Sequence, residues 1–113
     1  MPPRDWKFRI EDIIAAISDI LEFTRDLTFE SFCQDLKTTK AVLYNLAVIG
    51  EAARRVPEEI TSQYPTLPWR EMGDMRNVVI HEYFGIDVTI LWETIQHDLP
   101  QLLPQLEKIL EGN

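Results

Sequence analysis

The chain has 113 residues, of which 45% are hydrophobic and 27% are charged, and its formal net charge is −8. This length fits a single domain covering residues 1–113, large enough for a hydrophobic core, although a partner chain would add to its stability. The composition is typical of a globular protein, and the acidic balance argues against a broad electrostatic grip on nucleic acid, because such binders usually carry a basic face.

Several classes of protein are excluded by what the sequence lacks. No run reaches the length of a membrane helix and the N-terminus has no apolar core like that of a signal peptide, so we expect a cytoplasmic protein with no membrane contact. The single cysteine, Cys33, suits a reducing cytosol, and we expect it to be a small buried hydrophobe. His97 is expected at the surface, and no clustering of histidine with cysteine or carboxylates predicts a metal site.

Charge is distributed unevenly along the chain. Ten of the eleven lysines and arginines lie between Arg4 and Arg76, whereas Lys108 is the one basic residue beyond them, against six acidic residues. The C-terminal third should therefore be an acidic surface that repels RNA. It is either a surface for a basic protein partner or a solvated face that keeps the protein soluble.

The first helix is predicted from apolar residues at steps of three and four. It begins with Asp5 as its N-cap and ends near residues 25–26, and Thr28 then starts a short turn through Phe32. Its apolar stripe consists of Trp6, Ile10, Ile13, Ile17, Ile20 and Leu21.

A second long helix is predicted from Asp35 or Thr38 to Val56. Small residues, Ala47 and Gly50 among them, would allow a close helix neighbour. Glu51 lies in the same region and is either a surface or capping carboxylate or a support for a functional site.

Prolines 57, 65 and 68 punctuate the middle of the chain, so residues 58–64 form at most a short helix. Pro68 suits the first turn of the next helix, whose core residues should be Met72, Met75 and Val79. A polar stripe lies beside them, which is either a solvated face or part of a site: Arg70, Asp74, Asn77 and His81.

Asp87 is a suitable N-cap for a last helical segment, in which Pro100 should cause a kink or break. The residues expected to face inward are Val88, Leu91, Trp92, Ile95, Leu99, Leu102, Leu103, Leu106 and Leu110. No segment alternates with the period of a strand. The sequence therefore predicts an all-α protein, an up-and-down bundle of four to five helices.

Chemistry-bearing side chains are concentrated between Arg76 and Tyr83. On a helix, Arg76 and Tyr83 share a face, whereas Arg76 and His81 point roughly 140° apart. Either the helix unwinds near His81, with Gly85 as a stop, or a second copy of the chain completes the site across a two-fold axis. From the residues alone, Tyr83 could equally be a buried aromatic whose hydroxyl has one partner.

This segment, Arg76-Asn77 followed by His81-Glu82-Tyr83 and then Gly85-Ile86-Asp87, resembles the motif of the HEPN superfamily. The surrounding sequence is similar to its HepT toxin branch over nearly the whole chain. The resemblance includes Pro68-Trp69-Arg70, the upstream Ile49-Gly50-Glu51-Ala52-Ala53 and the downstream stretch from Trp92 to Leu99-Pro100.

The resemblance implies a metal-independent endoribonuclease that needs no cofactor, with Arg76 and His81 in a composite site at a homodimer interface. In such a site His81 would carry protons, Arg76 would bind the scissile phosphate, and Asn77 would orient the imidazole or donate to the phosphate. It further implies the toxin of a type VII toxin-antitoxin system, silenced when an MntA-like nucleotidyltransferase antitoxin transfers AMP to Tyr83. Since some HEPN domains have lost catalysis, the alternative is a non-catalytic helical adaptor that dimerises and binds a nucleotide or protein partner.

Overall fold

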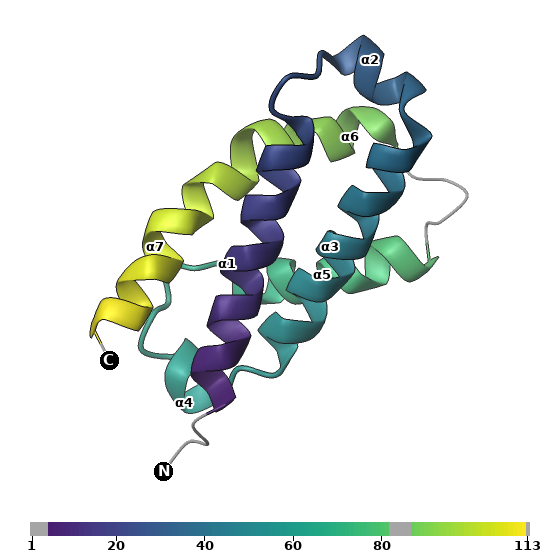
Figure 1. The fold of residues 1–113 in the computed structure, drawn as a ribbon. Coiled ribbons are helices and arrows are strands. Elements are labelled where there is room, and N and C mark those ends of the chain that lie inside the picture. Colours follow the sequence, from purple (N-terminus) through teal and green to yellow (C-terminus); the bar gives the residue numbers. More distant parts are fainter. Residues whose placement is uncertain (1–4, 82–86, 113) are drawn as a thin grey trace.

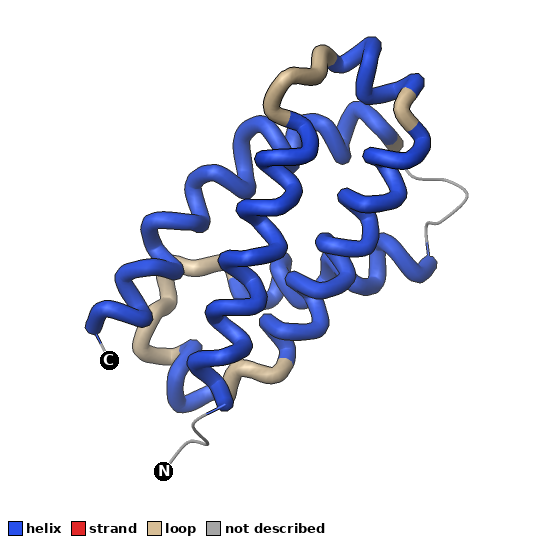
Figure 2. The backbone as a smooth tube through the Cα atoms, viewed as in Figure 1, coloured by secondary structure: helices blue, strands red, loops and turns tan. Residues whose placement is uncertain are grey.

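The computed structural model describes residues 5–81 and 87–112, without the side chains of residues 5 and 78–81. Across these ranges the regular structure is helical and no strand occurs (Figure 2). The prediction of an all-α protein is therefore confirmed. Its elements are α1 (Asp5–Thr24), α2 (Phe29–Gln34), α3 (Leu36–Arg54), α4 (Glu58–Thr61), α5 (Trp69–His81), α6 (Val88–Glu93), the π-helical turn η1 (Thr94–Asp98) and α7 (Leu99–Gly112).

The long helices α1, α3 and α7 lie lengthwise beside one another, and α5 crosses behind α3 (Figure 1). α1 contacts both α3 and α7, while α5 packs against the opposite side of α3 and runs obliquely to it. The start of α1 and the end of α7 lie at the same end of the bundle, next to the short helix α4. α3 is therefore the central helix, because it lies between α1 and the helix that carries the predicted motif.

The core follows the predicted stripes. Ile10, Ile13, Ile17 and Ile20 of α1 are fully buried, and each such side chain contributes roughly 1.5–3 kcal/mol to stability. The remaining fully buried large side chains come from α2, α3, α5, η1 and α7: Phe32, Val42, Ile49, Met72, Ile95, Leu99, Leu106 and Ile109.

Side-chain caps fix where α2 and α3 begin. Thr28 and Ser31 form a capping box, in which each hydroxyl accepts a hydrogen bond from the other residue's amide, at 3.1 and 2.8 Å. Asp35 then caps α3, accepting from the amide of Thr38 at 3.0 Å and from its hydroxyl at 2.7 Å. These bonds to the charged carboxylate lower the pKa of Asp35 below its usual value.

One prediction near the N-terminal end was wrong, whereas the predicted N-cap role of Asp5 concerns a side chain that lies outside the described residues. Cys33 is exposed rather than buried, because the six-residue helix α2 turns Phe32 into the core and leaves the next position facing solvent.

The expected irregularity at Pro100 takes the form of a π-helical turn. In an α-helix the ring of Pro100 would clash with the carbonyl four residues earlier, which also loses its amide donor. The turn before it is widened instead, and the amide of Leu99 donates to the carbonyl of Thr94, five residues back. The chain therefore passes from α6 to α7 without leaving helical structure.

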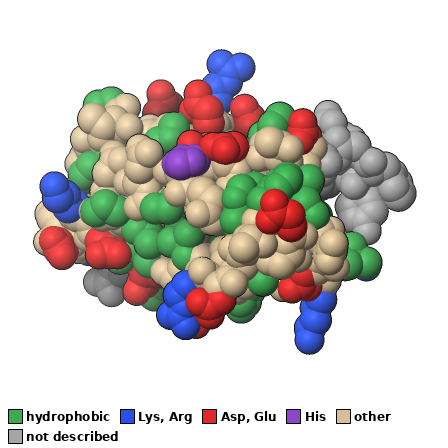
Figure 3. All heavy atoms as spheres, turned by 90° about the horizontal axis from the view of Figure 1, so that it is seen from above, with side chains coloured by type: hydrophobic (Ala, Val, Ile, Leu, Met, Phe, Trp, Pro, Cys, Tyr) green, Lys and Arg blue, Asp and Glu red, His purple; other side chains and the backbone are tan. Residues whose placement is uncertain are grey.

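The described surface agrees with the uneven charge of the sequence. Every described acidic residue beyond Arg76 is exposed, and on the face seen in Figure 3 acidic side chains are widespread while few basic ones appear. None of the helices within residues 5–81 and 87–112 is both long and apolar enough to cross a membrane.

α3 and α5 approach each other closely at Gly50. A Cβ atom added at Gly50 would lie 2.5 Å from the amide nitrogen of Arg76 and 2.7 Å from its Cβ. No flexible side chain can yield there, because the obstacle is the backbone of α5. The prediction of a close neighbour beside the small residues of α3 is thus confirmed.

We expect Gly50→Ala to lower the free energy of unfolding by about 1–3 kcal/mol, because the two helices must separate to admit the methyl group. In an uncrowded helix the same change would stabilise the protein. Urea denaturation of the variant would measure the difference. Gly112→Ala is the matched control, since its new Cβ would meet only the hydroxyl of Tyr64, at 4.0 Å, and should cost little. A Gly50→Ala protein as stable as the original would contradict the close contact.

Candidate functional site

The helix that carries the predicted motif is anchored at its N-terminal end. The carbonyl of Pro68 accepts the first helical hydrogen bond, from the amide of Met72 at 2.9 Å. The indole nitrogen of Trp69 donates to the carbonyl of Tyr64 at 3.0 Å, and Met72 is fully buried. These contacts fix the start of α5, and the contact with Gly50 fixes its middle.

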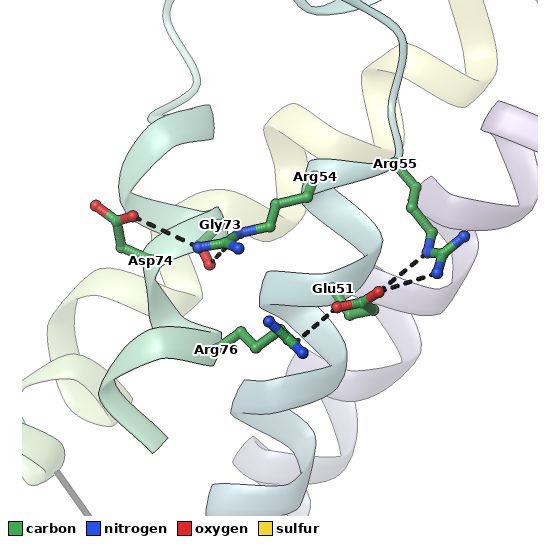
Figure 4. A network of polar contacts seen from close by, with 6 residues as sticks. All are labelled: Glu51, Arg54, Arg55, Gly73, Asp74 and Arg76. Carbon is green, nitrogen blue, oxygen red and sulfur yellow. Dashed lines mark hydrogen bonds and ion pairs between the residues drawn. The ribbon is translucent and has the colours of Figure 1, made fainter. Parts of the chain in front are cut away.

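Arg76 is placed where α5 touches α3, and its guanidinium turns back toward α3 (Figure 4). Its Nε forms an ion pair with Oε2 of Glu51 at 2.8 Å, and 41% of the Arg76 side chain remains exposed. Among the described residues Arg76 has no other polar partner, so its two terminal nitrogens are unpaired there. The arrangement holds the guanidinium by one edge and leaves the other donors for a ligand.

Glu51 is shared between two arginines. Its second oxygen, Oε1, accepts from Nη2 and Nε of Arg55 at 3.0 and 3.2 Å. Figure 4 shows the carboxylate lying between the two guanidinium groups, one from each helix. One negative charge therefore faces two positive ones, and this part of an acidic protein carries a local positive excess.

A second arginine of α3 ties down the same stretch of α5. Nε of Arg54 donates to the carbonyl of Gly73 at 3.1 Å, and its Nη2 lies 3.9 Å from a carboxylate oxygen of Asp74. The side chain of Arg54 thus reaches from α3 to α5, whereas that of Arg76 reaches from α5 to α3 (Figure 4). The position of Arg76 is set by backbone contact and by polar contacts on both sides of it.

The predicted site residues fall unequally within the described part of the chain. Arg76 and Asn77 are both half-buried on α5. His81 is the last residue of α5, but its side chain lies outside the described residues, as does all of Tyr83. The backbone is helical through His81, so positions 76 and 81 lie on faces roughly 140° apart.

Arg55 is the neighbour of Arg76 that the sequence analysis missed. The signal was available in part, because Glu51 and Arg55 are four residues apart on one helix and should pair. What the sequence does not contain is the approach of Arg76 to the same carboxylate. The interpretation of Glu51 as a capping residue is wrong, since its partners are these two arginines.

Two other features lie apart from this cluster. His97 is exposed and its Nε2 lies 3.3 Å from Glu93, one turn earlier, as expected for a surface residue. A groove of about 400 Å³ lies between α5 and the C-terminal helices, away from Arg76. It is lined by Thr66, Pro68, Glu71, Met72, Met75, Asp98, Gln101, Leu102 and Gln105.

Comparison with known proteins gives consistent results. Residues 13–109 match the HepT-like family, described as ribonuclease HepT-like. A protein of Thermococcus cleftensis named "Probable ribonuclease HepT" is 46% identical over 106 residues, which cover 94% of this chain and 96% of that protein. A Methanocaldococcus jannaschii protein named "Putative RNase" is 40% identical over 111 residues, which cover 98% of this chain and 92% of that protein.

No solved structure matches the chain. The family match nevertheless spans most of the sequence, including all of α5 and the Arg76–Glu51 contact. With relatives this similar over nearly their full lengths, the chain belongs to the HepT-like ribonuclease family.

Proposed function

We propose that this protein is a metal-independent endoribonuclease and the toxin of a type VII toxin-antitoxin system, acting in the cytoplasm. The observation that carries the proposal is the placement of Arg76, fixed by Glu51 and by the contact with Gly50 while its terminal nitrogens stay unpaired among the described residues. A guanidinium fixed in this way can bind a phosphodiester through two parallel hydrogen bonds. Membership of a ribonuclease family supports RNA as the substrate.

The reaction needs no metal if protons and charge are handled by side chains. The 2′-oxygen of the substrate attacks the neighbouring phosphorus and loses its proton to a base, while the 5′-oxygen leaves with a proton from an acid. The products are a 2′,3′-cyclic phosphate and a 5′-hydroxyl. His81 is the proton carrier, and Arg76 stabilises the charge that grows on the phosphorane oxygens.

His81 is the one histidine that each chain contributes to the proposed site, and it cannot easily serve as both acid and base. The geometry of the helix adds to this difficulty. Positions 76 and 81 lie on different faces of α5, so a single copy does not direct both toward one phosphate. A homodimer solves both problems, because a two-fold axis brings Arg76 and His81 of each copy to one shared site. Asn77, one turn before His81, would orient the imidazole or donate to the phosphate.

Silencing would act through Tyr83. An MntA-like nucleotidyltransferase antitoxin would transfer AMP from ATP to the phenol oxygen, releasing pyrophosphate. The new phosphodiester adds a negative charge seven residues from Arg76, a spacing that shares a helical face if α5 continues, and would occupy the anion site that RNA needs.

A second candidate is a non-catalytic helical adaptor that dimerises and binds a nucleotide or protein partner. The ion pair of Arg76 with Glu51 gives this alternative its one support, because a carboxylate at 2.8 Å competes with phosphate for the guanidinium. The two functions differ in whether RNA is cut.

We expect the purified chain to cleave cellular RNA in the presence of EDTA and to leave cyclic phosphate ends. His81→Ala and Arg76→Ala should each reduce the rate at least about 100-fold, since each removes a group acting in the transition state. Gel analysis and end-group mapping measure this result. His97→Ala is the matched control and should cleave normally, because His97 is an exposed surface histidine.

Two outcomes would contradict this proposal. Cleavage that EDTA abolishes would require a metal, and cleavage that survives in both variants would remove Arg76 and His81 from the reaction. If the unmodified protein is dimeric and does not cut RNA, the adaptor function is correct instead.

We expect a nucleotidyltransferase antitoxin of the MntA type, supplied with ATP, to add AMP to the chain and to abolish cleavage. Intact-mass spectrometry should show the added adenylyl group, and peptide mapping should place it on Tyr83. Tyr83→Phe should gain no AMP, whereas Tyr44→Phe, a change at a tyrosine exposed on α3, should be modified normally. Modification elsewhere with full loss of activity would contradict the assigned position.

Glu51 should act as a positioning residue for Arg76. We expect Glu51→Gln to lower kcat about tenfold with RNA binding kept or strengthened, because the guanidinium loses its orientation while a competing charge is removed. Steady-state kinetics measure the change in kcat, and RNA binding is measured separately in protein that also carries His81→Ala and does not cut the RNA. Glu22→Gln is the control, since Glu22 is an exposed carboxylate of α1 whose ion-pair partner is Arg25 rather than Arg76. Unchanged kcat in Glu51→Gln would contradict the role.

A further inference from the structure

The outer face of α3 carries a continuous row of exposed and half-exposed side chains that leads away from Arg76. On a helix, Lys40 and Tyr44 lie within about 20° of the direction of Glu51, and Lys37 and Arg55 within about 40°. The other sides of α3 are covered by α1 and α5. We call this row, Lys37, Lys40, Tyr44, Glu51 and Arg55, the α3 face.

The charge of this face is opposite to that of the protein. Residues 36–55 contain four basic side chains, Lys37, Lys40, Arg54 and Arg55, and one acid, Glu51, in a chain whose net charge is −8. The preceding acid, Asp35, is engaged by Thr38 as the cap of the helix. A polyanion approaching the molecule would therefore be attracted to α3 and repelled by the C-terminal helices.

Tyr44 is the most exposed of the large apolar residues described, at 70%. None of the described residues gives its ring a stacking partner or its hydroxyl a hydrogen bond. It lies seven residues before Glu51, about 10 Å along the helix. Ala47 and Val48 lie between Tyr44 and Glu51 along the helix, and both are half-buried. Because their side chains are short, they project little above the helix surface between these two residues.

We propose that the α3 face binds single-stranded RNA beside the cleavage site, with a base stacked on Tyr44 and backbone phosphates on Lys37 and Lys40. Interleaved aromatic and basic residues are what sequence-tolerant binding of a single strand requires. Arg55, paired with Glu51, continues this path to Arg76. The proposal rests on the proposed ribonuclease function and names how that enzyme holds the substrate around the scissile phosphate.

Charge favours RNA over a second copy of the chain as the occupant of this face. A two-fold interface centred on the α3 face would place its lysines and arginines against the same residues of the partner. Like charges facing each other destabilise an interface, whereas a phosphodiester chain neutralises them.

The test is the affinity of a fluorescently labelled single-stranded RNA for the full chain carrying His81→Ala, measured by anisotropy. Adding Tyr44→Ala should weaken binding about tenfold, the loss expected for one stacked base, while Tyr44→Phe should bind normally because the ring is kept. In the cleaving protein the loss should fall mainly on KM. Phe8→Ala is the matched control, an aromatic side chain 63% exposed on α1, and should change neither quantity.

Salt dependence tests the lysines separately. Lys40→Gln should make the slope of log affinity against log salt concentration shallower by about 0.7, the value for one phosphate contact on a single strand. Lys108→Gln removes an exposed lysine of α7 and should leave the slope as it was.

Three outcomes would contradict the proposal, and each leads to a different conclusion about the α3 face or the protein. If the original protein cleaves RNA and Tyr44→Ala binds as tightly as its parent, the α3 face is not the RNA path although the enzyme function stands. If Tyr44→Ala separates a dimer into monomers in analytical ultracentrifugation, the face is an interface between copies. If the protein neither binds nor cleaves RNA, the proposed function fails as well.

Discussion

The contact between α3 and α5 at Gly50 is the constraint on which the rest of the site depends. Because residue 50 has no side chain, the backbone of α5 lies directly against α3. The backbone of Arg76 is therefore close to α3, and its side chain reaches Glu51. A guanidinium on a more distant helix would have to span the gap with its full length and would lose more side-chain entropy when held. Close backbone packing therefore makes one ion pair sufficient to orient Arg76.

The polar cluster at this contact reconciles an acidic protein with an anionic substrate. Arg54, Arg55 and Arg76 gather where the two helices meet, and one shared carboxylate separates two of them. Because most acidic side chains lie elsewhere, attraction and repulsion act on different parts of the surface. The net charge of the chain is thus a poor guide to what a particular face can bind.

Much of the fold could be predicted from the sequence, because it is encoded in local patterns: the apolar steps of α1, the helical turn that begins at Thr28, the N-cap at Asp87 and the small residues of α3. Cys33 was predicted wrongly because the six-residue helix α2 is too short for its burial to follow from periodicity. The sharing of Glu51 by Arg55 and Arg76 could not be predicted, since it depends on the distance between two helices, and Glu51 and Arg76 are more than 20 residues apart in sequence. The roles of His81 and Tyr83 stay predictions drawn from their spacing and the family motif.

The π-helical turn before Pro100 also explains a detail of the apolar pattern. Leu91, Ile95 and Leu99 are all buried, and two consecutive steps of four would turn an α-helix about 80° past two full revolutions, toward the edge of its apolar face. The wider turn absorbs that rotation, so residues 94–98 behave as an α-helix holding one extra residue. The length of the chain at this point is therefore part of the fold: a single deletion here would restore a regular helix while forcing Pro100 into its interior, and the last turns would face the bundle with a different side.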